Sequence, residues 1–72
     1  MNAEDMILKA KEDTAKIFQM MNSCFDHKIQ NLSEWVVVAC IIAEVLKVDR
    51  KSIDEDMIRS FIQQFNDEKE GK

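Results

Sequence analysis

The sequence contains no proline and no tyrosine, and it has one glycine, Gly71, and one histidine, His27. A lone glycine at the end of the chain excludes a glycine-rich loop that cradles phosphate groups. Without proline or internal glycine, nothing in the composition interrupts a long helix. The single histidine leaves few groups for acid–base or nucleophilic chemistry. We therefore expect a helical protein that is not an enzyme.

Cysteine is also scarce, with Cys24 and Cys40 alone. Cys24 and His27 would be neighbours on a helix, a spacing typical of half a zinc site or of a thiol–imidazole pair. A structural zinc site needs four ligands, and Cys40 lies in an apolar stretch, so we expect neither a metal nor another cofactor. Cys24 is expected to pack as a small apolar side chain. Two free thiols without a secretory signal predict a reducing cytoplasm.

The charge balance and the size restrict the partners. A net charge of −4 argues against nucleic acid and anionic membranes as binding partners. The apolar content of 46% is typical of a folded chain, and 72 residues make one domain with a thin core. Domains of this size are often stabilised by a disulfide, a metal or a second subunit.

The most apolar stretch is "EWVVVACIIAEV", Glu34 to Val45. It is about half the length needed to cross a membrane, which is about 20 residues. Its β-branched residues would suit a strand, but the chain offers no second strand to pair with it. We therefore predict a helix over 33–48 with Ser33 as N-cap, apolar on nearly every side and buried at the centre.

The flanking segments read as amphipathic helices over 3–25 and 53–66, followed by a polar tail over 67–72. The first carries an unbroken heptad seam, and Ser52 with Glu55 predicts a capping box for the second. The seam positions are Ala3, Ile7, Ala10, Thr14, Ile17, Met21 and Cys24. The predicted fold is all-α, a single small three-helix bundle over 1–72.

Counting the sides of the central helix predicts an interface. At about 100° per residue, one side of the 33–48 helix holds Trp35 and Ile42, and two neighbouring helices can cover two sides. A third side carries Val37, Ile41 and Val48 next to Glu44, and these residues form the candidate interface. The partner is a second copy, as in a homodimer, or another protein. The alternative is that the two flanking helices wrap more of the central helix.

Two local resemblances add alternatives. "IIAEVLKVDRKSIDEDM", 41–57, resembles the first helix and following loop of acyl carrier proteins, which implies a carrier-like or assembly subunit. The Asp-Ser-Leu that carries phosphopantetheine in that family is missing, and Ser60 falls inside the third predicted helix. The stretch also resembles a helix-turn-helix, which implies a DNA-binding regulator, yet its second helix opens with three acids, 54–56. Our main prediction is a protein–protein interaction module, a regulator, adaptor or inhibitor that presents a helical surface.

Overall fold

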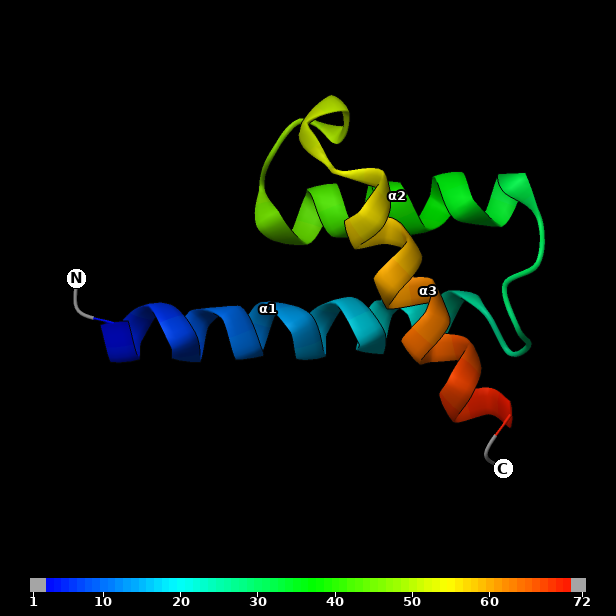
Figure 1. Cartoon of the computed structure of the whole chain (residues 1–72), viewed down its shortest axis with the longest axis horizontal. Coiled ribbons are helices and arrows are strands. Elements are labelled where there is room, and N and C mark those ends of the chain that lie inside the picture. The colour runs from blue at the N-terminus through cyan, green and yellow to red at the C-terminus, as the bar shows by residue number, and fades with distance from the viewer. Residues whose placement is uncertain (1–2, 71–72) are drawn as a thin grey trace.

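The computed structural model describes residues 3–70, which form three α-helices and one turn of 3-10 helix. The helices are α1 (Ala3–Cys24), α2 (Leu32–Leu46) and α3 (Glu55–Glu70), and the turn is η1 (Arg50–Ser52). Figure 1 shows α2 running back alongside α1, with α3 crossing both. No strand occurs in the described part of the chain, so the predicted all-α three-helix bundle is confirmed.

The core is built around α2, which contacts α1, α3 and η1. Val38 and Ile42 of α2 are fully buried, as are Met21 of α1 and Phe65 of α3. Phe65 meets the ring of Phe25 edge-on, with centroids 6.3 Å apart. Over residues 3–70 no polar or charged residue is buried. Burial of apolar area therefore stabilises the bundle without buried polar networks.

The start and end of α2 differ from the predicted range of 33–48. Asn31, not Ser33, is the N-cap, because its Oδ1 accepts the N–H of Glu34 at 2.9 Å. Glu34 reciprocates, since its Oε1 accepts the N–H of Gln30 at 3.1 Å. At the other end Lys47 adopts the left-handed conformation, with φ 58°, and α2 ends at Leu46. A left-handed residue is a common helix terminator, although glycine usually occupies it.

The range of α3 also differs from the prediction of 53–66. Ser52 belongs to η1, and Asp54 caps α3 instead by accepting the N–H of Asp56 at Oδ1, 3.2 Å away. At its far end, α3 continues to Glu70 through part of the predicted polar tail. Lys28 Nζ lies 2.6 Å from Glu70 Oε1 and ties this last turn to the α1–α2 connection. Residues 71–72 of the predicted tail lie outside the described range.

Candidate interaction surface

The predicted interface on α2 is only partly exposed. Ile41 is 5% exposed and belongs to the core of its own chain, so its assignment to an uncovered side was wrong. It lies about 60° around the helix from fully buried Val38, at the flank of the covered side. The prediction counted two covering helices, whereas α2 also has η1 against it.

The rest of the predicted interface forms a narrow strip, the α2 strip. Val37 is 40% exposed, and Glu44 and Val48 are also exposed. Cys40 lies among them, with the guanidinium Nη1 of Arg50 3.7 Å from its sulfur. Val37, Cys40 and Glu44 share one side of α2, and Val48 follows the end of the helix, so the strip mixes apolar and polar side chains.

A larger apolar surface lies on the first half of α1. At 1.5 Å per residue, α1 is about 33 Å long and α2 about 22 Å, so α1 extends well past its neighbour. Figure 1 shows these first turns of α1 beyond both other helices. Within α1 no residue before Ile17 is buried. We call residues 3–14 the overhang, and Met6, Ile7 and Leu8 on it are 60%, 55% and 58% exposed.

A groove of about 410 Å³ runs where the overhang meets the bundle. All three helices contribute to its apolar walls, and Lys9 and Asp13 also line it. We call it the α1 groove, and its apolar lining residues are Met6, Ala10, Ile17, Leu46, Met57 and Phe61. A second hollow on the other flank of α1 is lined by Ile7, Ala10 and Lys11, among others. The overhang is thus apolar on both flanks, and on the side of the α1 groove residues of α2 and α3 help to enclose it.

Sequence reasoning recognised the heptad seam of α1 but assigned all of it to packing within the chain. The predicted lengths of the first two helices already indicated that part of the first helix extends past the second. A helix over 3–25 is seven residues longer than one over 33–48, which is about 10 Å at 1.5 Å per residue. The shorter helix could not cover the whole seam.

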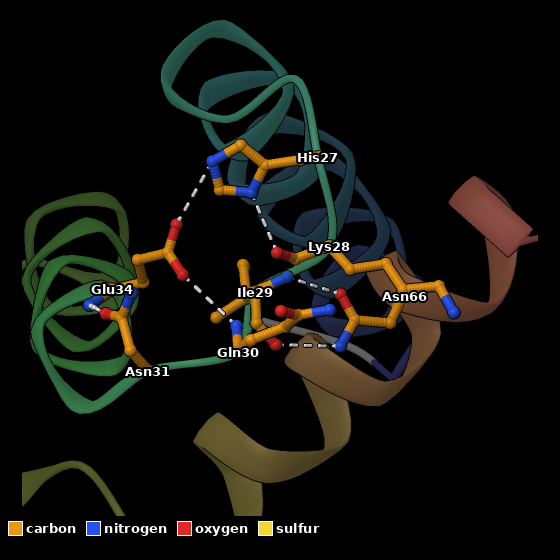
Figure 2. Close-up of polar contacts among 7 residues, drawn as sticks. All are labelled: His27, Lys28, Ile29, Gln30, Asn31, Glu34 and Asn66. Carbon is orange, nitrogen blue, oxygen red and sulfur yellow. Dashed lines mark hydrogen bonds and ion pairs between the residues drawn. The ribbon is translucent and has the colours of Figure 1, made fainter.

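A cluster of polar side chains fastens the α1–α2 connection (Figure 2). The imidazole Nδ1 of His27 donates to the Lys28 carbonyl at 2.8 Å, and Nε2 lies 3.4 Å from Glu34 Oε2. The Lys28 carbonyl and then the Glu34 carboxylate raise the pKa of His27 above 6.5. From α3, the side-chain amide of Asn66 makes two hydrogen bonds to the backbone of Ile29. Its Oδ1 accepts the Ile29 N–H at 2.8 Å, and its Nδ2 donates to the Ile29 C=O at 3.1 Å. These groups are used in holding the connection in place.

The structure does not bring the side chains of Cys24, Cys40 and His27 together in one site. Cys24 and Cys40 are both free and exposed, so the expectation that Cys24 packs as an apolar side chain was wrong. The ring nitrogens of His27 face Lys28 and Glu34. Across 3–70, no three His, Cys, Asp or Glu side chains are grouped in a way that could hold a metal ion.

Among the same residues, no helix has the length and apolar character needed to cross a membrane. The connection between α2 and α3 spans residues 47–54, longer than the three or four residues of a helix-turn-helix. Comparison with known proteins gives no match to a family model, a curated protein or a solved structure. The surface itself is therefore the basis for a functional proposal.

Proposed function

We propose that the chain is a small protein–protein interaction module that binds a helix of its partner along the overhang and the α1 groove. The observation that carries this proposal is the exposure of Met6 and Ile7, each more than half accessible and each lining a hollow along α1. Burying one such side chain fully is worth about 1.5–3 kcal/mol. Ala10 lies between Met6 and Ile7 around the helix and lines both hollows, so these side chains form one apolar surface, which is typical of an interaction site.

The shape of the surface favours a helical ligand. The groove is open and elongated along α1, and amphipathic helices commonly bind by laying an apolar face into such a groove. Lys9 and Asp13 among its lining residues offer one charge of each sign to a partner. The α2 strip is the second candidate surface, with Val37 and Val48 less exposed than the overhang residues.

We further propose that the module acts as a regulator, adaptor or inhibitor, by binding alone and without a cofactor. The polar groups best placed for chemistry, around His27 and Asn66, are used in fastening the α1–α2 connection. The free thiols of Cys24 and Cys40 suit a reducing compartment, which supports a cytoplasmic location.

Photo-crosslinking in the cells that make the protein tests the proposal. A photoreactive benzophenone amino acid at Ile7 should give a discrete protein adduct, because Ile7 faces the bound helix. The matched control places the same group at Gln19, which is exposed on α1 beyond the overhang. Substituting Ala10→Lys, which lines both the α1 groove and the hollow beside Ile7, should abolish the Ile7 adduct. Equal adducts from both positions, or none from Ile7, would overturn the proposal.

A further inference from the structure

We infer that the helix bound by the overhang is the overhang of a second copy of the chain, packed antiparallel in a two-fold dimer. This inference rests on the proposed function and names its partner. It follows from the seam of α1, from the position of the bundle at one end of that seam, and from the charges beside it.

The seam on the overhang is suited to close helix packing. It consists of Ala3, Ile7, Ala10 and Thr14, at alternating spacings of four and three. The hydroxyl of Thr14 donates to the Ala10 carbonyl of its own helix at 2.8 Å. This bond satisfies the polar group of Thr14 within the helix, so its methyl group is available for an apolar contact.

The position of the bundle at one end of the seam favours an antiparallel orientation of the second copy. Further along the seam, Ile17 and Met21 are buried within their own chain. A parallel copy would bring both bundles to the same end, and the two α1 helices would have to separate after Thr14. An antiparallel copy places the bundles at opposite ends and pairs only the overhangs. It also brings the partner's Ala3 beside Thr14, next to the α1 groove.

The charges beside the seam support the same alignment. When Ile7 packs against the partner's Ala10, and Ala3 against the partner's Thr14, Glu4 lies opposite the partner's Lys11. Two-fold symmetry makes this pair twice. Neither Glu4 nor Lys11 takes part in the ion pairs found among residues 3–70. In a parallel pair, by contrast, Lys11 would face the partner's Met6, and Glu4 would gain no ion pair.

Sedimentation equilibrium of charge variants tests the inference. The wild-type chain should dimerise, and Glu4→Lys or Lys11→Glu alone should weaken the dimer roughly tenfold, because two attractive pairs become repulsive. An equimolar mixture of the two variants should regain wild-type affinity, because the lysine introduced in one chain then meets the glutamate introduced in the other. A mixture no tighter than its components would overturn the antiparallel alignment.

Apolar variants separate the overhang from other surfaces. Ile7→Lys should abolish dimerisation, whereas Leu8→Lys, at a similarly exposed position off the seam, should change it less than about twofold. Trp35 fluorescence should be unchanged in both variants, since no overhang residue is buried. Loss of the dimer in Val37→Lys but not in Ile7→Lys would overturn the inference in favour of the α2 strip.

The two proposals fail separately. A wild-type chain that stays monomeric up to about 1 mM would overturn the dimer. If Ile7 still crosslinks in cells, to a polypeptide other than this chain, the proposed interaction module stands with a foreign partner. Absence of both the dimer and the adduct overturns the two proposals together.

Discussion

At the scale of the residue, Ile41 and Val37 show how sharply burial changes within one turn of α2. Ile41 is almost fully buried, whereas Val37 is 40% exposed. We expect Ile41→Ala to lower the free energy of unfolding by about 2–5 kcal/mol, because the lost methyl groups leave a cavity. Val37→Ala should stay within about 1 kcal/mol of the wild type. Urea unfolding followed by circular dichroism measures both, and equal losses would contradict the burial of Ile41.

His27 makes stability depend on pH. Its pKa is raised in the folded chain by the Lys28 carbonyl, which accepts the Nδ1–H, and by the Glu34 carboxylate. Because the folded pKa lies above the ordinary 6.5, the protonated ring favours the folded state. This contribution is fully present below pH 6.5 and is lost as the pH rises through the folded pKa.

The expected result is a free energy of unfolding that falls across this interval in the wild type. His27 is the only histidine in the chain. His27→Gln should therefore remove the whole contribution of imidazole groups to this pH dependence. The ring titration followed by NMR should have its midpoint above 6.5. A midpoint below that value would show that the two contacts of the ring do not persist in solution.

At the scale of the element, the α1–α2 connection depends on one side chain of α3. Asn66 satisfies both the N–H and the C=O of Ile29 in a partly buried position (Figure 2). Asn66→Ala should therefore cost about 1–3 kcal/mol and expose the Ile29 amide to hydrogen exchange.

The matched control for Asn66 is Asn22→Ala, which removes an exposed bond to the Phe18 carbonyl within α1. That variant should change stability by less than about 0.5 kcal/mol and leave the Ile29 amide protected. An Ile29 amide that exchanges equally fast in the wild type and in Asn66→Ala would show that the clamp is open in solution.

Periodicity was sufficient to predict the three helices, but not where they begin and end. Asn31 and Ser33 are both good N-caps, and the choice depended on whether Glu34 could bond back to the preceding backbone. At the other end of the chain, the last turn of α3 carries Glu70, which pairs with Lys28, a residue distant in sequence. The cap of α2 is local, and its Asn31–Glu34 spacing is visible in the sequence. The pairing of Glu70 with Lys28 is a contact between distant segments, which a single-sequence pattern does not contain.

Of the predicted interface residues on and after α2, Val37, Glu44 and Val48 are exposed, whereas Ile41 is buried in its own chain. The prediction treated Ile41 as exposed, whereas Ile41 packs into the core cluster that the three helices share. The seam of α1 was recognised, but a seam alone does not show what covers it. The difference between the predicted helix lengths indicated that part of the seam extends past the central helix, and the structure shows that this part is the first half of α1 (Figure 1).

At the scale of the whole molecule, the overhang makes the chain less compact than its size requires. Its radius of gyration is 12.6 Å, whereas a compact chain of this length has about 11 Å. The core lies between Ile17 and Phe65, and the first turns of α1 extend from it (Figure 1). A second chain along the overhang would cover the surface that this shape leaves exposed.

Substitutions in the overhang and substitutions in the core affect different properties of the chain. Substitutions from residue 3 to 14 remove no buried contact, so they change the outer surface with little effect on folding. Substitutions at core positions such as Met21 or Phe65 act on folding first. If the overhang binds the partner as proposed, changes in the first three turns of α1 can alter the choice of partner while the rest of the bundle stays under constraint.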